Sequence, residues 1–336
     1  MKVRYLQSGN ALYGGVKVAL QHAMGLRALG VDARILSPDP PPDWFDGAEE
    51  VCLRCEPGVE RLPAADVAVG TFWFTVPMAF AVPGARAFHL CQCYEGLYEG
   101  VREEWPAIDA VYRLPTTKLA VSPHLVTLLE QRFGQPVHWI PQPLESGQFR
   151  PRSQPRSDDG TFRVLVTGLW DLDIKGVQWA LRALRPLADE HPPLRLVRLS
   201  LDAPAAEIAC WPEAERHLHV PPSAVPGVFG SVDAYVGPST EVEGFSLPAL
   251  EAMSSGLPSV LTDIGAARAL DPAARASLRV PHGDEIGLRA ALRRLRDDPA
   301  LRARLGNAGR EIALEFSVER SARALLAVFE AALVGS

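Results

Sequence analysis

Short apolar segments alternate along the chain with longer segments whose apolar residues recur every three or four positions. Within 16–30, for example, Val16, Ala19 and Ala23 would share one face of a helix. The segment before it, KVRYLQ at 2–7, is typical of a short strand. Further strands are predicted at 31–37, 65–71, 86–92, 117–122, 162–168, 194–200 and 232–238. Strands that alternate with helices predict parallel α/β sheets.

The pattern is interrupted between residues 142 and 160, where the chain becomes polar and rich in Pro, Ser and Arg. Such a composition is typical of a linker between domains, and a length of 336 residues also favours two domains over one core. We therefore predict an N-terminal Rossmann-like domain at 1–150 and a C-terminal one at 151–336, whose last helix can pack back on the N-terminal domain. Ligands in such folds bind beyond the carboxyl ends of strands, which favours the cleft between the two domains.

Composition and charge narrow the class of protein. A content of 47% hydrophobic and 22% charged residues is typical of a globular protein, and the net charge of −6 argues against nucleic acid as a partner. The start, MKVRYLQSGN, lacks the apolar region of a signal peptide. The longest apolar stretch, 71–85, is interrupted by Pro77 and Pro83 and is too short to cross a bilayer. We therefore expect a cytoplasmic protein without a transmembrane segment.

Four of the five cysteines occur in two pairs, Cys52 with Cys55 and Cys91 with Cys93. Four thiolates can bind zinc in principle. However, the second pair lies in a predicted strand, no pair of histidines follows, and the gap of 35 residues between the pairs matches no zinc pattern known to us. We expect reduced, partly buried thiols, with a metal or redox site as the alternative.

A glycine-rich loop follows the first predicted strand. Gly9 and Gly14 have the spacing of a phosphate-binding P-loop, but Gly15 and Val16 stand where that loop needs Lys and Ser or Thr. No G-x-G-x-x-G follows the strand, which argues against a dinucleotide-binding enzyme. The glycines provide either a tight turn or a close approach of the backbone to a ligand.

Two glutamates, Glu243 and Glu251, flank the predicted start of a helix in the segment EVEGFSLPALEAMSSGLPSV. Proline is favoured at the first helical position, so we predict a helix that begins at Pro248. Leu247 would then be the cap residue, and leucine cannot accept a hydrogen bond from the first amides. These amides and the positive end of the helix dipole would suit an anion or a sugar oxygen. The alternative is that Glu251 only complements the dipole.

A lysine, Lys175, lies just before a predicted helix, in the segment TGLWDLDIKGV that follows the strand at 162–168. At the end of a strand an ammonium group can reach a phosphate that is bound there. Lysines often begin helices without such a role, so this signal gains its weight from the glutamate pair later in the chain.

Taken together in chain order, these motifs resemble the retaining GT-B-fold glycosyltransferases of glycosyltransferase family 4. The resemblance covers nearly the whole chain, and its segments are GG at 14–15, AVSPHLVTLL at 120–129, VHWIPQPLESGQFRP at 137–151, IKG at 174–176, EGFSLPALEAMSSGLPSVLTD at 243–263, VPHGDEIGLRAAL at 280–292 and RLGNAGREIALEFS at 304–317. GTFWFTVP and HLCQCYEGLYEG are similar to the rhamnosyltransferase-like branch. The resemblance implies an α/β GT-B fold, in which two Rossmann-like domains face each other across a cleft.

The same resemblance implies roles for the residues of the second domain. Glu243 would hold hydroxyls of the donor sugar and stabilise the transition state, and Glu251 would bind the ribose of the nucleotide. Lys175 would neutralise the diphosphate, which gains negative charge as the glycosidic bond breaks. Further donor contacts would come from Gly168, from Gly244, Phe245, Ser246 and Leu247, and, for the base, from the backbone near Val220.

One position departs from the family pattern. The family usually has an arginine directly after the glycine of the strand-end motif, and this chain has Leu169 there. Another cation, for example Arg198 or one from the first domain, would have to replace it, or donor binding would be weakened.

In the first domain the resemblance implies an acceptor side or a phosphate loop. Gly14 and Gly15 belong to that loop, and His89 is a candidate for the family's histidine, although a core histidine on a strand is the favoured interpretation. Other candidates on the acceptor side are Gln92, Tyr94 and Glu95.

The expected function is therefore metal-independent, retaining transfer of a sugar from a nucleotide diphosphate-sugar to an acceptor hydroxyl, with no cofactor. Its partners are the donor and a carbohydrate or other hydroxyl acceptor. One alternative, suggested by Leu169, is an inactive partner protein that binds nucleotide-sugars. A Rossmann oxidoreductase is a further alternative, which the missing dinucleotide motif disfavours.

Overall fold

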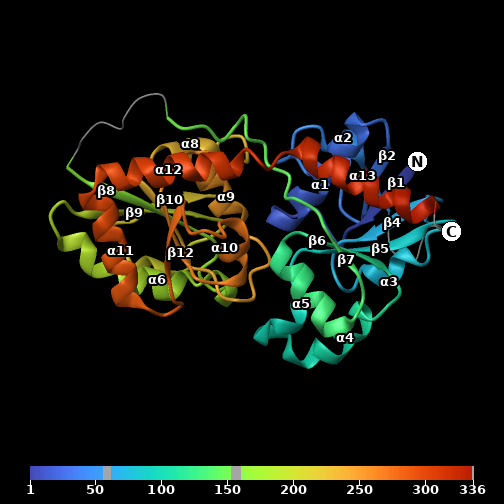
Figure 1. Cartoon of the computed structure of the whole chain (residues 1–336), viewed down its shortest axis with the longest axis horizontal. Coiled ribbons are helices and arrows are strands. Elements are labelled where there is room, and N and C mark those ends of the chain that lie inside the picture. Colours follow the sequence, from blue (N-terminus) through green and yellow to red (C-terminus); the bar gives the residue numbers. More distant parts are fainter. Residues whose placement is uncertain (56–61, 153–159, 335–336) are drawn as a thin grey trace. The chain divides into compact units, whose positions relative to one another are not determined.

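The computed structural model describes residues 1–55, 62–152 and 160–334. Residues 153–159 of the predicted linker lie outside this part. The chain divides into two compact units, one of Met1–Pro143 with Phe316–Ser336 and the other of Leu144–Glu315. Each unit is built on its own parallel sheet (Figure 1), which confirms the α/β class that the alternating pattern predicts.

The first unit contains a seven-stranded sheet of order β3-β2-β1-β4-β5-β6-β7. Its strands are β1 Lys2–Leu6, β2 Asp32–Ser37, β3 Cys52–Arg54, β4 Val67–Gly70, β5 Arg86–Cys91, β6 Thr117–Ala120 and β7 Val137–Trp139. Its helices are α1 Gly14–Ala28, α2 Ala48–Val51, α3 Val76–Ala79, α4 Trp105–Tyr112, α5 Pro123–Phe133 and α13 Val318–Val334, with 3-10 turns η1 Glu95–Leu97 and η2 Glu99–Glu104.

The second unit contains a six-stranded sheet of order β10-β9-β8-β11-β12-β13. Its strands are β8 Phe162–Thr167, β9 Leu194–Ser200, β10 Glu215–Leu218, β11 Ala234–Gly237, β12 Ser259–Thr262 and β13 Ser277–Val280. Its helices are α6 Val177–Leu184, α7 Ala205–Cys210, α8 Val225–Gly230, α9 Leu247–Ser254, α10 Gly265–Leu270, α11 Glu285–Asp297 and α12 Pro299–Ala313, with 3-10 turns η3 Asp173–Lys175 and η4 Arg185–Asp189.

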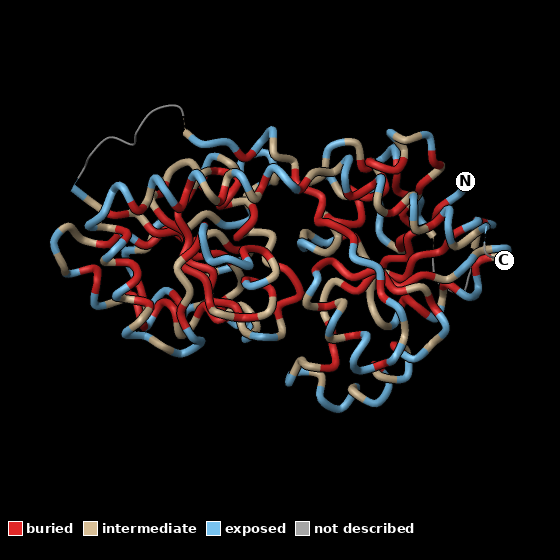
Figure 2. Tube along the Cα trace, in the orientation of Figure 1, coloured by how far each residue is buried: buried red, intermediate tan, exposed pale blue. Residues whose placement is uncertain are grey.

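Buried residues are concentrated on the strands of both sheets (Figure 2). Every residue of β4, β11 and β12 is buried, as expected for parallel strands that are covered on both faces. The sequence pattern predicted eight of the strands in the described part of the chain but missed β3, β7, β10, β12 and β13. All five have only three or four residues, and all lie at an edge of a sheet or, in the case of β12, next to one, so they carry little periodic signal.

The last helix, α13, belongs to the first unit, where it packs along α1 (Figure 1). The two helices approach closely at Gly25, since a Cβ atom there would lie 2.9 Å from the Cβ of Ala322. Further along α13, the ring of Phe329 lies 4.9 Å from that of Phe88 on β5. The C-terminal segment thus completes the core of the unit in which the chain begins.

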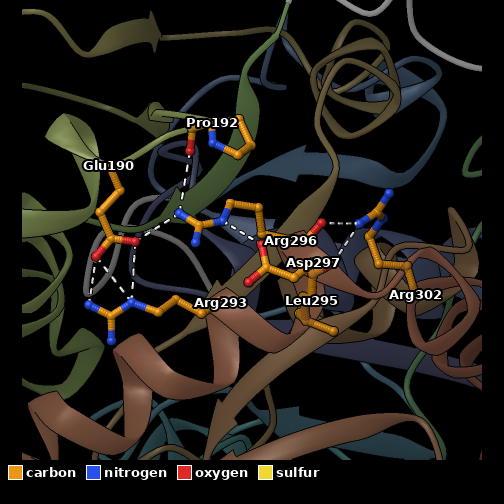
Figure 3. A network of polar contacts seen from close by, with 7 residues as sticks. All are labelled: Glu190, Pro192, Arg293, Leu295, Arg296, Asp297 and Arg302. Carbon is orange, nitrogen blue, oxygen red and sulfur yellow. Dashed lines mark hydrogen bonds and ion pairs between the residues drawn. The ribbon is translucent and has the colours of Figure 1, made fainter.

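In the second unit, a carboxylate anchors helix α11 to the turn that follows η4 (Figure 3). Glu190 accepts hydrogen bonds from Arg293 Nη2 at 2.6 Å and from Arg296 Nη1 at 2.8 Å. These two guanidinium groups lower the pKa of Glu190 to about 2. Directly after α11, the side chain of Asp298 caps the next helix, α12, because it accepts a hydrogen bond from the amide of Leu301.

Candidate active site

Two loops at the carboxyl ends of neighbouring strands, β8 and β11, are tied together in the second unit. The amide of Thr240 donates to the carbonyl of Ile174 at 2.9 Å, and the Trp179 indole donates to the carbonyl of Pro238 at 3.2 Å. Gly176 has a φ of 60°, and a Cβ atom on it would lie 2.0 Å from the Pro238 carbonyl oxygen. Only glycine therefore permits this approach of the two loops.

This arrangement brings the predicted residues Lys175 and Glu243 into direct contact. Lys175 Nζ lies 2.6 Å from Glu243 Oε2, and the same oxygen accepts a hydrogen bond from Ser239 Oγ at 3.0 Å. Glu243 is only 8% exposed, so its charge needs such partners. A cation and a carboxylate of different loops thus meet at the carboxyl-terminal edge of the sheet.

The start of helix α9 differs from the prediction. The helix begins at Leu247, and its cap residue is Ser246, whose Oγ accepts a hydrogen bond from the amide of Ala249 at 3.4 Å. The prediction that this helix lacks a side-chain cap is therefore wrong. Its error was to place Pro248 at the first helical position, whereas proline occupies the second, where its missing N–H is equally harmless.

The second predicted glutamate, Glu251, lies beyond the first turn of α9 and is half-buried. The first turn contains no acidic residue, so the dipole at the very start of the helix does not account for this carboxylate. Glu243 and Glu251 both act on the buried hydroxyl of Tyr235, whose pKa is raised by burial first and by these two charges in addition. The two carboxylates therefore lie around one phenol group on β11.

Neither Tyr235 nor Ser239 was among the predicted site residues. The Tyr235 hydroxyl lies 3.2 Å from Thr167 Oγ1 at the end of β8 and also hydrogen-bonds to the Ser246 side chain, so it joins two strand ends to the cap of α9. The available signal was position alone, since Ser239 comes two residues after a buried strand. Such serines are too common in loops to be selected without the contact itself.

Arg198 is not available as a substitute for the arginine that was expected at the position of Leu169. Its side chain is fully buried, and its Nε and Nη2 bind the carboxylate of Glu207 at 3.0 Å. It also donates to the carbonyls of Val166 and Gly168, each at 2.7 Å. The expectation that Arg198 could contact a diphosphate is therefore corrected: Arg198 supports the backbone at the end of β8.

The remaining predicted donor residues lie around the same edge. Gly168 has a φ of 109° and is close to the aliphatic stem of Lys175, because a Cβ atom there would lie 3.1 Å from Lys175 Cγ. Phe245 is buried at 7% exposure, and Leu247 is half-buried. Val220 follows β10, after His219, which has a φ of 50°. Positive φ in a residue other than glycine marks a constrained turn.

In the first unit, Gly14 and Gly15 are the first residues of α1. The side-chain amide of Gln92 donates to the carbonyl of Gly15 at 3.2 Å, and a Cβ atom on Gly15 would lie 3.0 Å from Gln92 Nε2. The structure thus brings together the predicted loop residues and one of the predicted acceptor-side residues, at the carboxyl ends of β1 and β5.

The other predicted acceptor-side residues are inside the first unit. Tyr94 is 1% exposed and donates to Asp109, whereas Glu95 is 4% exposed and accepts a hydrogen bond from Tyr112. Burial is the main cause that raises the pKa of Glu95. His89 is fully buried, which agrees with a core histidine. The expectation that Tyr94 and Glu95 directly face an acceptor is therefore corrected, because aromatic side chains of α4 and α5 enclose the segment that follows β5.

The cysteine pairs are far apart within the first sheet. Cys52 begins β3 and Cys91 ends β5, and β2, β1 and β4 lie between these two strands. Four strand intervals correspond to roughly 19 Å, which is too far for one four-thiolate site. Burial raises the pKa of the Cys52 thiol to about 11 and that of Cys91 further, so both are protonated and unreactive at neutral pH.

Within residues 1–55, 62–152 and 160–334, no helix has the length and apolar character needed to cross a membrane.

Comparison with known proteins relates this geometry to a family. Residues 161–298 match the family Glycosyl transferases group 1. The MMP alpha-(1->4)-mannosyltransferase of Mycolicibacterium hassiacum is 32% identical over 205 residues, or 59% of this chain and 49% of that protein. The lipopolysaccharide core biosynthesis mannosyltransferase LpsB of Rhizobium meliloti is 34% identical over 109 residues, or 32% of this chain and 31% of that one. The chain thus aligns with half or less of the length of these relatives.

Solved structures resemble the chain over its whole length. Sucrose-phosphate synthase from Thermosynechococcus elongatus covers 100% of both chains with a TM-score of 0.83 at 17% identity. Anabaena HepE in complex with UDP and glucose covers 98% of this chain and 99% of its own, with a TM-score of 0.80 at 13% identity. At such identities the likeness concerns the fold alone. Residues 161–298 are therefore a glycosyl transferases group 1 domain, and the chain has the GT-B fold of the glycosyltransferases it resembles.

Proposed function

We propose that the protein is a retaining glycosyltransferase that moves a sugar from a nucleotide diphosphate-sugar to a hydroxyl of a carbohydrate or other acceptor. The observation that carries this proposal is the contact between Lys175 and Glu243, 2.6 Å apart at the strand ends of the group 1 domain. Two relatives are named as mannosyltransferases, and HepE was solved with UDP-glucose, which supports a nucleotide-sugar donor.

Each residue has a distinct part in the proposed reaction. Lys175 binds the diphosphate and offsets the negative charge that grows as the bond between sugar and phosphate breaks. Glu243 holds hydroxyls of the donor sugar and stabilises the positive charge that develops at its anomeric carbon. Glu251 binds the ribose. The acceptor attacks from the face that the diphosphate leaves, and a phosphate oxygen takes up the proton of the acceptor hydroxyl.

In this proposal the ammonium of Lys175 replaces a metal ion at the diphosphate. The lysine is suited to this because 28% of its side chain is exposed, whereas only 9% of the Glu243 side chain is exposed. A diphosphate that approaches Lys175 therefore meets an accessible cation next to the carboxylate proposed for the sugar.

The first test is a thermal-shift screen with nucleotides and nucleotide-sugars, including UDP-glucose and GDP-mannose. A ligand at a hundred times its Kd stabilises the folded state by about 2.7 kcal/mol, which is readily measured. Nucleotide release from the best donor then measures turnover, by transfer or by slow hydrolysis. We expect Glu243→Gln to lower kcat by roughly a hundredfold or more, with a smaller effect on donor KM.

A matched control for this variant lies two residues away. Glu241 is exposed and accepts a hydrogen bond from the amide of Gly265, so Glu241→Gln changes a carboxylate of the same loop outside the proposed site. Equal nucleotide release by wild type and Glu243→Gln would refute the role proposed for Glu243. No donor hydrolysis by the wild type with any nucleotide-sugar would favour an inactive binding protein.

The nucleotide contacts have separate tests. Lys175→Ala should weaken binding of UDP or another nucleoside diphosphate while leaving the nucleoside itself nearly unaffected, because only the diphosphate carries the charge. Glu251→Gln should weaken both by roughly 1–3 kcal/mol, the range for a charge-assisted hydrogen bond. Titration calorimetry distinguishes these patterns, and equal losses for nucleoside and diphosphate in Lys175→Ala would indicate an effect on folding instead.

A further inference from the structure

The carboxylate of Glu243 has two hydrogen-bond partners in the described part of the chain, and both bind the same oxygen. Lys175 Nζ and Ser239 Oγ approach Oε2 at 2.6 and 3.0 Å. The second oxygen, Oε1, is thereby left for a ligand. One partner is charged and flexible, while the other is a short side chain on the same loop, four residues before the glutamate.

Donor binding would change only one of these partners. If Lys175 binds the diphosphate, as the proposed function requires, its ammonium group leaves Oε2 of Glu243 and contacts the more highly charged phosphates instead. The Lys175 side chain is 28% exposed and ends a long flexible stem, so this movement needs no change of backbone. Glu243 would then lose its charge partner at the moment when it must be held in place beside the sugar.

Ser239 is itself held firmly. It is 7% exposed, and its carbonyl accepts a hydrogen bond from Thr262 Oγ1, at the end of β12, at 2.5 Å. The residues on either side are also fixed, because the Pro238 carbonyl accepts from Trp179 and the Thr240 amide donates to Ile174. The Ser239 hydroxyl therefore stays in position when the lysine moves.

We propose that Ser239 is a positioning residue: it keeps Oε2 of Glu243 in place after Lys175 has turned to the diphosphate, so that Oε1 faces the donor sugar. This inference rests on the proposed function and adds a residue to it. In the ligand-free protein, Lys175 and Ser239 share the carboxylate, and during catalysis Ser239 alone of these two holds it.

The experiment measures nucleotide release with the best donor for wild type, Ser239→Ala and Ser239→Thr. A hydrogen bond to a charged group corresponds to about ten- to a hundredfold, so Ser239→Ala should lower kcat by that factor with donor KM and UDP affinity nearly unchanged. Ser239→Thr keeps the hydroxyl and should recover most of the activity. Ser259→Ala, a fully buried serine on β12 that bonds only weakly to the Leu257 carbonyl, is the matched control and should behave like wild type.

A double variant separates positioning from a general structural role. Once Glu243→Gln has removed the carboxylate, Ser239→Ala should cause little additional loss, because the serine acts through that group. If the serine merely supported the loop, the loss of kcat in the double variant would equal the product of the losses in the two single variants. If Ser239→Ala does not fold, the comparison of Ser239→Thr with Ser239→Val tests the hydroxyl at constant shape.

The outcomes distinguish this inference from the proposed function. If wild type turns over a donor and Glu243→Gln is impaired, full activity of Ser239→Ala overturns the role of Ser239 alone. Multiplicative losses in the double variant overturn it as well. If Glu243→Gln releases nucleotide as fast as wild type, the proposed function of the loop fails first, and the role of Ser239 fails with it.

Discussion

The two units have the same parallel α/β architecture but bury their polar side chains differently. In the first unit, His22 and His89 are buried, and neither nitrogen of either ring has a hydrogen-bond partner within the described residues. In the second unit, the buried guanidinium of Arg198 is paired with Glu207 and donates to two backbone carbonyls. These buried histidines of the first unit are thus neutral and unpaired, whereas the buried arginine of the second unit is a charge that its partner neutralises.

These two kinds of buried polar group have different consequences for protonation and for backbone geometry. A buried imidazole without partners must remain neutral, and burial lowers the pKa of His22 and of His89 to about 3 each. A buried ion pair, in contrast, can fix the geometry of the backbone to which it bonds. In the second unit that backbone includes Gly168, at the strand end beside Lys175.

The largest expected effect comes from breaking the buried pair of the second unit. Arg198→Met leaves Glu207 as a buried charge and removes the donors to Val166 and Gly168, which should cost roughly 3–5 kcal/mol of unfolding free energy. Arg216 Nε, 3.8 Å from the same carboxylate, offsets a part of this cost. Urea unfolding measures the loss, and hydrogen exchange should show it first in β8 and β9.

Removing both partners provides the control for that prediction. Arg198→Met combined with Glu207→Leu eliminates the unpaired charge and should recover much of the lost stability. A double variant as unstable as the single one would show that the bonds to the backbone, and not the ion pair, hold this region.

The first unit should instead lose stability in mild acid. The unfolded state binds protons at these histidines below pH 6.5 and the folded state does not, so stability is complete above pH 6.5 and falls as the pH falls toward 3. Between pH 6.5 and 5 the loss is about 2 kcal/mol for each histidine. Urea unfolding of wild type and His89→Leu at several pH values measures it.

His89→Leu should remove the contribution of His89 to the pH dependence of the unfolding free energy. Hydrogen exchange in β5 locates the effect in the first unit, while β8 of the second unit serves as an internal reference. An identical pH dependence in wild type and His89→Leu would mean that His89 becomes protonated without unfolding.

A smaller effect is expected where the end of the chain completes the first unit. Gly25→Ala would place a Cβ atom 2.9 Å from Ala322 Cβ and 3.0 Å from Val318 Cγ1, forcing α1 and α13 apart. Overpacking costs about 1–3 kcal/mol, and the better helix propensity of alanine returns up to about 1 kcal/mol. We therefore expect a net loss of about 1 kcal/mol in thermal unfolding. Ala322→Gly in the same chain should restore the fit, and no restoration would contradict the packing argument.

The smallest effect is expected at the partly exposed carboxylate of the second unit. The pKa of Glu190 is lowered to about 2 by Arg293 and Arg296, so its contribution is complete above about pH 4.5 and is lost as the pH falls toward 2. Because solvent screens the group, Glu190→Gln should cost less than about 1 kcal/mol at pH 7. Wild type and variant should converge in stability near pH 2, and a constant difference down to that pH would exclude the ion pair as its cause.

Local sequence patterns were sufficient to predict the alternation of strands and helices, and with it two parallel α/β units. The same patterns place Lys175 and Glu243 after strands, whereas their direct contact became visible only in the folded unit. These features depend on local periodicity and on the order of elements, both of which are written in neighbouring residues. The start of α9 was a local question too, but Pro248 fits two positions and the sequence alone did not choose between them.

Which polar side chains are accessible and which are enclosed by the protein follows from the tertiary structure alone. Arg198, Tyr94 and Glu95 were expected near ligands, and each is buried against partners distant in the sequence or on a neighbouring helix. Ser239 was not predicted because its contact with Glu243 exists only in the folded unit. Residue type and spacing describe what a side chain can do, whereas its partner is chosen by elements that the whole fold brings together.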